Sequence, residues 1–474
     1  MIGWARKAAK QVWLGGVRAA DRRERRRLGM LDHDLLPALW DAGVDADGQL
    51  VLGGCDAVGL AERFGTPLFV VDKARLRKDY TAVLEGFRRH HPSVEVSYSY
   101  KTNPLPGVLR TLHDWGAGAE VISHFELWLA LRLGVPPEQV IFNGPAKTHE
   151  ALALAVSRGV RLINVDNLSE IDAIEKLAAQ EGRTQRIGVR VVTSVGWSGQ
   201  FGLGIRQGDA REAFERARRC PHLDPCALHL HLGTGIKNVE VYLRAVREVL
   251  EFADELRERA GVAIRFFDLG GGFGIPTVRP FSSTDFRLIA NGFPPGLVDP
   301  DAAPRIEGYA GRIVELFRQH RSGTGPEAPV LIFEPGRAVT SRSQTLLLRV
   351  VAVKAASGGR FNAILDGGKN VAMPPGFEYH EVFPASRMRE ARHATYDLYG
   401  PLCHPGDVVR ASLRMPKLAP GDVIAVMDAG AYFVPNQMNF SNPRCGAVMV
   451  DRGTAEWIRR HESFEDVVGR DELP

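Results

Sequence analysis

Short apolar runs alternate with longer amphipathic segments between residues 66 and 337. Runs such as VEVSYSY, GAEVIS and RIGVRVV are largely apolar and rich in β-branched residues, which is typical of strands buried on both faces. Segments such as LSEIDAIEKLAAQEG and VEVYLRAVREVLEFADELRERAG instead carry apolar residues at helical spacing. Eight such strands, from PLFVVD (67–72) to IRFFDLGGG (264–272), alternate with helical segments. This α/β pattern predicts a parallel (β/α)8 barrel of the TIM type over residues 66–337.

The pattern changes after residue 337. LLLRVVAVKAA, FNAILDGG, DVVRASLR and DVIAVMDAGAY are strand-like runs that glycine and proline turns connect, with few helical segments between them. Such a pattern predicts an antiparallel β-barrel domain over residues 338–474. We expect residues 31–65 to pack with this β domain, and residues 1–30 to form a basic extension.

Composition narrows the class of protein. The chain is 45% hydrophobic and 24% charged, as in soluble globular proteins with a large core, and no apolar run approaches the length of a membrane span. No secretory signal is apparent, and the five cysteines are scattered without a C-x-x-C pair. This cysteine usage argues against a disulfide scaffold and a structural zinc site. We therefore expect a cytoplasmic protein without a membrane or metal partner.

The first thirty residues concentrate positive charge. They contain nine lysines or arginines against Asp21 and Glu24, whereas the whole chain has a net charge of only +4. One interpretation is a solvated extension. The other is a docking arm in which an apolar stripe lies beside the arginines, and its members would be Trp4, Trp13, Leu14 and Val17. An acidic partner protein suits such an arm better than nucleic acid, because nothing else in the chain resembles a nucleic-acid module.

Candidate catalytic residues follow the predicted barrel strands, where barrel enzymes place their active sites. Lys101 follows VEVSYSY, although a lone lysine in this position is more often a surface residue. His231 lies in HLHLGTG at the end of another strand. The glycines Gly270–Gly272 expose backbone N–H groups that suit a phosphate, and EPGR supplies Glu334 and Arg337. These residue types suit amine chemistry and the binding of a phosphate group.

Nine motifs resemble those of one enzyme family. GTPLFVVD, YSYKTN, GAEVISHFEL, INVDNLSE, HLGTG, DLGGGFGI, EPGR, GPLCHPGD and DAGAY occur between about residues 50 and 450 in the order found in diaminopimelate, ornithine and arginine decarboxylases. This family has the fold type III, or alanine racemase-like, barrel and uses pyridoxal 5'-phosphate. The resemblance implies α-decarboxylation of an L-amino acid or an amino-acid derivative.

The resemblance also implies a role for individual residues. Lys101 would hold the cofactor as a Schiff base, Glu334 would keep the pyridine nitrogen protonated, and His231 would stack on the ring. Cys403 would protonate the substrate carbon after CO₂ leaves, and it would do so in the active site of the partner subunit. The functional unit would then be a head-to-tail homodimer with shared active sites. The remaining cofactor-binding residues would be Arg190, Thr234, Gly270, Gly271, Gly272, Gly336, Arg337 and Tyr432.

The substrate-binding region departs from the family pattern. His404 follows the cysteine where family members that act on diamino acids have an acidic residue, and Pro374 lies near the position of an expected arginine. Lys369 and Tyr379 are candidates to replace that arginine. We therefore expect a changed side-chain pocket and a substrate with a neutral or anionic distal end. A substrate of secondary metabolism is at least as consistent with this pocket as diaminopimelate is. The predicted substrate-binding residues are Arg337, Lys369, Tyr379, His404 and Tyr432.

Three alternatives stay open at this point. The substrate is either a free amino acid or an amino-acyl group on an acidic carrier protein that docks on the basic extension. The chain could also be an amino-acid racemase on the same fold, although such racemases place an arginine where this chain has Glu334. Finally, it could be an inactive homologue with a binding role, against which the retained Lys101, His231 and Cys403 argue.

Overall fold

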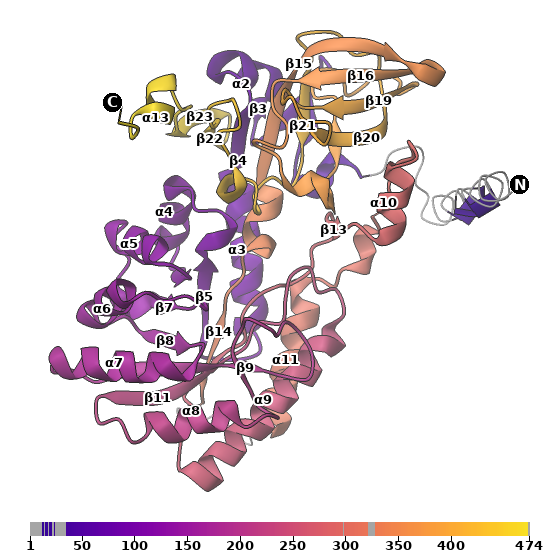
Figure 1. Cartoon of the computed structure of the whole chain (residues 1–474). Coiled ribbons are helices and arrows are strands. Elements are labelled where there is room, and N and C mark those ends of the chain that lie inside the picture. The colour runs from indigo at the N-terminus through magenta and orange to yellow at the C-terminus, as the bar shows by residue number, and fades with distance from the viewer. Residues whose placement is uncertain are drawn as a thin grey trace, which may run out of the picture. The chain divides into compact units, whose positions relative to one another are not determined.

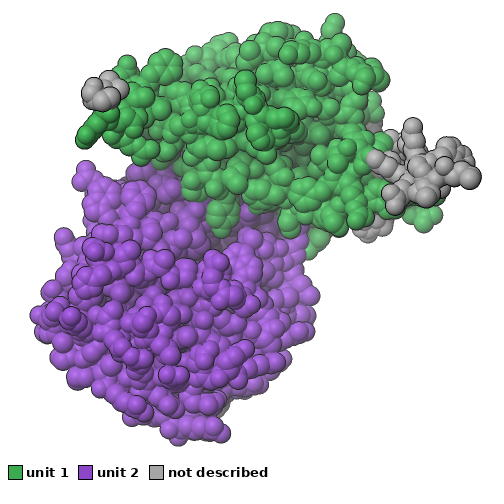
Figure 2. All heavy atoms as spheres, viewed as in Figure 1, with its two compact units in different colours: residues 1–75, 276–302, 342–474 green, residues 76–275, 303–341 purple. Residues whose placement is uncertain are grey.

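The computed structural model describes residues 12, 13, 15–17, 19, 20, 23, 35–296, 298–320 and 328–472. These residues form two compact units (Figure 2). The barrel unit contains residues 76–275 and 303–341. The sheet unit contains the described residues of 1–75, 276–302 and 342–474. Much of the predicted basic extension, including Trp4 and Leu14 of the proposed docking arm, lies outside the described residues.

Eight parallel strands close into a barrel, and this confirms the predicted fold class (Figure 1). Each strand pairs with the next around the ring, and the pairs β8–β9 and β14–β5 complete the circle. In order around the barrel the strands are β5 (Val94–Ser99), β6 (Gly118–Val121), β7 (Val140–Phe142), β8 (Leu162–Val165), β9 (Gln185–Val192), β11 (Leu223–His229), β12 (Phe266–Asp268) and β14 (Val330–Phe333). A short strand, β10 (Leu203–Gly204), extends the sheet beside β9.

Helices alternate with the barrel strands along the chain, and those that follow β5, β6, β7 and β8 begin close to the strand ends. Their bounds are α3 (Lys73–Arg88), α4 (Pro106–Asp114), α5 (His124–Arg132), α6 (His149–Arg158), α7 (Leu168–Gln180), α8 (Asp209–Ala217), α9 (Val239–Ala260) and α11 (Ile306–His320). Ser123, Thr148 and Asn167 cap α5, α6 and α7 by accepting hydrogen bonds from backbone N–H groups of the first turn. These caps fix where each strand ends, and therefore where the residues at its carboxyl end lie.

The sheet unit is built around a mixed sheet. Along the main path its strands are β20 (Val408–Met415), β19 (Ala394–Tyr399), β16 (Arg360–Leu365), β15 (Gln344–Ala356), β4 (Leu68–Asp72), β22 (Gly446–Asp451) and β23 (Thr454–Arg459). β21 (Val423–Val426) pairs with β15 and with β18 (Val382–Phe383). Most pairs are antiparallel, as the sequence predicts, whereas β16–β19 and β4–β22 are parallel.

The strand PLFVVD was predicted as the first barrel strand, and that placement is wrong. Its residues form β4, which pairs with β15 and β22 of the sheet unit. β4 is buried almost throughout, as the barrel strands are, so its apolar pattern does not indicate which sheet it joins. The eighth barrel strand is instead β14. Residues 276–302 lie within the predicted barrel range but belong to the sheet unit, in which β13 (Arg279–Pro280) pairs with β17 (Glu378–Tyr379).

The segment ahead of β4 contributes to the core of the sheet unit. Trp40 and Leu60 are buried in one apolar cluster with Leu347 of β15. The indole N–H of Trp40 donates a hydrogen bond to Asp428, which is fully buried (2.9 Å). Residues ahead of β4 thus form part of the core of the sheet unit.

Two global features bear on the class of protein. Among the described residues, no helix combines the length and the apolar character that crossing a membrane requires. All five cysteines are free thiols.

Candidate active site

Lys101 lies directly after β5, in the short helix η2 (Tyr100–Thr102). Its Nζ donates to Glu120 Oε2 at the end of β6 (2.9 Å), and the lysine side chain is 28% exposed whereas that of Glu120 is buried. Glu120 also accepts hydrogen bonds from Ser99 and Asn143. Behind it, burial and the charge of Glu120 raise the pKa of Glu126 to about 7. The lysine is therefore a half-buried amine beside a buried carboxylate, as an amine that binds a cofactor requires.

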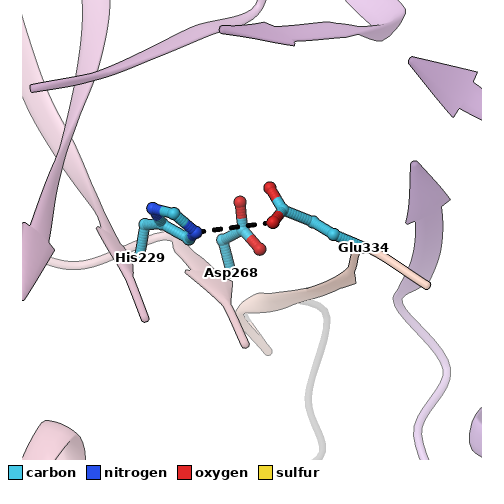
Figure 3. A group of neighbouring side chains, drawn as sticks. All are labelled: His229, Asp268 and Glu334. Atoms are coloured by element: carbon cyan, nitrogen blue, oxygen red, sulfur yellow. Dashed lines mark ion pairs between the residues drawn. The ribbon is translucent and has the colours of Figure 1, made fainter. Parts of the chain in front are cut away.

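Three buried ionisable side chains meet at the ends of adjacent strands (Figure 3). His229 ends β11, Asp268 ends β12 and Glu334 follows β14. His229 Nε2 lies 3.4 Å from Glu334 Oε2, and each of the three residues is at most 1% exposed. Because these strands are neighbours in the barrel, their carboxyl ends bring together residues that lie up to 105 positions apart in the sequence.

The two carboxyl groups of this trio cannot both be ionised without a large cost. Burial, together with the neighbouring Glu334, raises the pKa of Asp268 well above its ordinary value. Burial also opposes ionisation of Glu334, but His229, a hydrogen bond with Asp268 and the charge of Lys101 lower its pKa. Asp268 therefore retains a proton and donates it in a hydrogen bond, and Glu334 carries the negative charge.

Two asparagines connect the carboxylates. Asn143 Nδ2 donates to Glu334 Oε1 (2.6 Å) and to Glu120 Oε1 (3.1 Å). Asn164 Nδ2 donates to Asn143 Oδ1 (2.8 Å) and to Asp268 Oδ2 (3.3 Å). Sequence reasoning missed Asn143, Asn164, His229 and Asp268 as site residues. Each is a polar residue at or near the end of an apolar strand run, and that signal was available in VIFNGP, RLINVD, CALHLHLG and IRFFDLGGG.

The glycine turn after β12 has no room for side chains. A Cβ on Gly270 would lie 2.4 Å from the carbonyl oxygen of Leu230, and one on Gly271 would lie 2.2 Å from that of Glu334. At Gly272 the distance to the nearest carbonyl oxygen would be 2.1 Å, and Gly270 and Gly272 also have positive φ values of 63° and 83°. The bare backbone can therefore approach a phosphate closely.

His231 lies beside this turn. The N–H of Gly271 points to its Nδ1 at 3.5 Å. Burial lowers the pKa of His231 to about 3, and the positive charge of Lys101 adds to this effect. The imidazole is therefore neutral over the physiological range, which suits stacking on an aromatic ring without opposing a positive charge on it.

Arg190 on β9 is held by an acidic residue and an aromatic ring. Its guanidinium lies 3.5 Å from Asp166 Oδ2 and 4.3 Å from the centre of the Phe201 ring. Asp166 Oδ1 accepts the N–H of Gly202 (2.7 Å), and the N–H of Asp166 donates to Glu170 (3.0 Å). Arg190 is thus fixed near the end of β9, and its role beside the cofactor stays a prediction.

The other predicted cofactor residues of the barrel unit lie in its loops. Gly336 caps α12 (Arg337–Thr340), and a Cβ there would lie 2.0 Å from Thr102 Oγ1, next to Lys101. Arg337 is buried at the first position of α12, and Thr234 is exposed in the loop that follows β11. The turn after β14 is thereby packed against the segment that carries the lysine.

Five predicted residues belong to the sheet unit. Cys403 and His404 are exposed in the loop between β19 and β20, and Lys369 is half-buried in the turn after β16. Tyr432 has a left-handed backbone (φ 66°). Tyr379 is 2% exposed, and its hydroxyl donates to Glu381 (2.8 Å). That hydroxyl already has a buried acceptor, and its role in substrate binding stays a prediction.

The chemistry of the barrel unit fits pyridoxal phosphate. The barrel unit contains the half-buried amine of Lys101, the ionised carboxylate of Glu334 and the neutral imidazole of His231. It also contains the glycine turn after β12, which has no room for a Cβ. These groups are complementary to an aldehyde, a protonated ring nitrogen, an aromatic face and a phosphate.

Comparisons with known proteins agree with this chemistry. Residues 77–341 match the family model described as pyridoxal-dependent decarboxylase, pyridoxal binding domain. The chain is 31% identical over 447 residues to a diaminopimelate decarboxylase of Methanothermobacter thermautotrophicus, an alignment that covers 92% of this chain and 98% of that protein. It is 33% identical to one of Actinosynnema pretiosum subsp. auranticum, over 91% of this chain and 95% of that protein. The crystal structure of diaminopimelate decarboxylase from M. jannaschii matches with a TM-score of 0.82 at 27% identity, covering 91% of this chain and 98% of that one.

Lys101→Ala removes the predicted attachment point and should leave a folded protein without covalent cofactor. Borohydride reduction in the presence of pyridoxal phosphate, followed by peptide mass spectrometry, should label Lys101 in the wild type and no lysine of the barrel unit in the variant. The circular dichroism spectrum serves as the folding control. A label on a different lysine in the wild type would show that the assignment is wrong.

Asp268→Asn and Asp268→Ala test the proton on Asp268. Asparagine keeps a donor toward Glu334 and should change the free energy of unfolding little. Alanine removes that donor from the buried Glu334 carboxylate and should lower the free energy of unfolding by about 1–3 kcal/mol. The unfolded chain releases the Asp268 proton at lower pH than the folded protein does, so wild-type stability should fall as pH rises above about 4. The melting temperature of Asp268→Asn should decrease less than that of the wild type between pH 5 and 9. Equal damage by both substitutions would contradict a protonated Asp268.

Proposed function

The chain belongs to the pyridoxal-phosphate-dependent decarboxylases of fold type III and decarboxylates an amino acid with that cofactor, and from this premise we propose that its substrate has no distal ammonium group. The family assignment makes the racemase and the inactive-homologue alternatives unnecessary. The observation that carries the proposal is the side chain that follows Cys403. His404 Nδ1 accepts the N–H of Gly406 (3.0 Å), so the neutral imidazole has its proton on Nε2 and can only donate with that nitrogen.

An ammonium group needs acceptors, and a partly desolvated charge without a partner is costly. The His404 ring offers no acceptor beyond the one that Gly406 already uses. Lysine, ornithine and meso-diaminopimelate, the last being the substrate that the relatives' names imply, should therefore be poor substrates. An L-amino acid or amino-acid derivative with a neutral or anionic distal end should be preferred.

The barrel unit supplies the residues that hold the cofactor. When bound, pyridoxal phosphate supplies a ring that accepts the electron pair left as CO₂ departs. Lys101 would hold the cofactor through its amine, and the neutral imidazole of His231 would stack on the ring. Glu334, ionised because Asp268 retains the proton, keeps a proton on the ring nitrogen. The phosphate would be held by Gly270, Gly271, Gly272, Thr234 and Arg337, and Gly336 and Arg190 would lie near the cofactor.

Cys403 supplies the proton that the substrate carbon takes up after CO₂ leaves. Among the five cysteines, Cys403 is exposed, whereas Cys226 and Cys445 are buried and burial raises the pKa of each thiol, that of Cys226 to about 12. An exposed thiol is available to a second chain. We assign Cys403 to the active site of the partner subunit, so the functional unit is a homodimer with two shared sites.

The setting of the enzyme is a further part of the proposal. Free thiols fit a reducing compartment, and we place the enzyme in the cytoplasm. The basic extension suits an acidic carrier protein, which would present the substrate as a tethered amino-acyl group. The proposed function involves neither a nucleic acid nor a membrane.

Cys403→Ala should retain the absorbance of the bound cofactor and lose most turnover, because only reprotonation is removed. Mixed dimers with Lys101→Ala should regain up to about a quarter of wild-type activity, since random exchange leaves one intact site in half of the dimers. Cys220→Ala, which removes a half-buried cysteine of the barrel unit, is the matched control. Mixed dimers without activity, under conditions where subunit exchange is demonstrated, would count against shared sites.

A substrate panel tests the missing acceptor. The values of kcat/KM for lysine, ornithine and meso-diaminopimelate should be at least about tenfold below those for amino acids with a neutral or anionic distal end. His404→Asp restores an acceptor and should narrow this gap. Efficient turnover of meso-diaminopimelate by the wild type would overturn the proposal. Removal of residues 1–30 tests the carrier hypothesis separately, because it should impair only carrier-bound substrates.

A further inference from the structure

A single buried carboxylate fixes the turn after β16 against the loop that carries Cys403. Asp407 Oδ1 accepts the backbone N–H of Lys369 (2.6 Å), and Oδ2 accepts that of Leu402 (2.8 Å). Asp407 is 1% exposed. The two loops therefore hold a fixed register, although they are more than thirty residues apart in the sequence.

Glycines make this approach possible. A Cβ on Gly368 would lie 2.2 Å from Asp407 Oδ1, and one on Gly400 would lie 2.3 Å from Oδ2. No other residue type fits at either position without moving the carboxylate. The arrangement is thus built into the backbone and does not depend on a flexible surface contact.

The side chains of Lys369 and His404 border the same space. A Cβ on Gly406 would lie 2.8 Å from His404 Cε1 and 3.2 Å from Lys369 Nζ. The stem of Lys369 passes Gly376, where a Cβ would lie 3.8 Å from its Cε. The ammonium is thereby directed to the loop that holds Cys403 and His404.

The described side chains that border this space near Gly406 are the donors Lys369 and His404. Lys369 forms no ion pair with any residue that the structure describes, and Asp407 already accepts a backbone N–H with each oxygen. His404 presents an Nε2 proton, because its Nδ1 accepts the N–H of Gly406. A cation next to a neutral donor is complementary to a carboxylate, and charge-assisted hydrogen bonds are the stronger kind.

We propose that Lys369 and His404 bind a carboxylate at the distal end of the substrate, so that the enzyme acts on α-amino dicarboxylates that lack a distal ammonium group. The inference rests on the proposed function, since it takes the substrate side chain to lie along the loop of Cys403. It also assigns the anchor to Lys369 and not to Tyr379, whose hydroxyl donates to Glu381. Pro374, which lies near the expected family arginine, is buried in the η7 turn (Pro374–Gly376).

The test compares acids with their amides. Initial rates of CO₂ release are measured for the holoenzyme on L-glutamate and L-2-aminoadipate, and on L-glutamine and L-homoglutamine. Wild type should prefer each acid over its amide by about tenfold or more, the effect expected of one charge-assisted contact. Lys369→Met should reduce this ratio by about tenfold, and Lys369→Arg should retain most of it. Lys354→Met, which removes an exposed lysine of β15, should leave the ratio as in the wild type.

Two outcomes would overturn the inference. These are a wild-type preference for the amides and a ratio that Lys369→Met leaves unchanged. If the wild type releases CO₂ from no amino acid tested, the proposed function fails instead, and the site is judged by calorimetric binding of L-2-aminoadipate to the holoenzymes. Binding about tenfold weaker in Lys369→Met supports the site. Equal affinities, or no binding by either protein, refute it.

Discussion

Two carboxyl groups buried side by side in an apolar barrel are the constraint on which the active site depends. Asp268 and Glu334 end neighbouring strands and have no contact with solvent, so one of them must retain a proton. His229 and Lys101 favour the charge on Glu334, and Asp268 takes the proton. A buried anion is thus held at one position before any ligand arrives, which is the arrangement that preorganised electrostatic catalysis requires.

The surrounding structure supports that charge. Asn143 donates to Glu334 and to Glu120, and so connects the buried pair with the carboxylate beside Lys101. The glycine turn after β12 approaches the backbone of Glu334 so closely that a side chain at Gly271 would displace it. Burial also keeps His231 neutral. These contacts all lie within the barrel unit.

The sequence predicts much of this site because strand ends can be recognised by pattern. Lys101, His231, Glu334 and the glycine turn all follow apolar runs, and the barrel rule places such residues together. Asn143 and Asp268 lie at the same kind of position, but a single polar residue at a strand end does not indicate whether it serves structure or chemistry. Their importance depends on which strands are neighbours, and β4 shows that an apolar run does not encode its neighbour: it joins β15 and β22 and not the barrel. Likewise, the spacing of Lys369 and His404 in the sequence does not indicate that they lie side by side. Their two loops are held together by Asp407, which accepts a backbone hydrogen bond from each loop.

The two units differ in what their sequences retain. The barrel unit carries the motifs that resemble the family's cofactor site, whereas the sheet unit carries His404 and Pro374, at which the chain departs from the pattern that the resemblance implies. We interpret this as retained chemistry with a changed substrate.

The proton of the buried pair lies on Asp268, so that ionised Glu334 would stabilise a proton on the ring nitrogen of the bound cofactor. The most direct measurement is the ¹⁵N chemical shift of the pyridine nitrogen in holoenzyme prepared with ¹⁵N-labelled pyridoxal phosphate. The account predicts a protonated nitrogen in the wild type and an unprotonated one in Glu334→Gln. An unprotonated nitrogen in the wild type, or the same shift in both proteins, would contradict it.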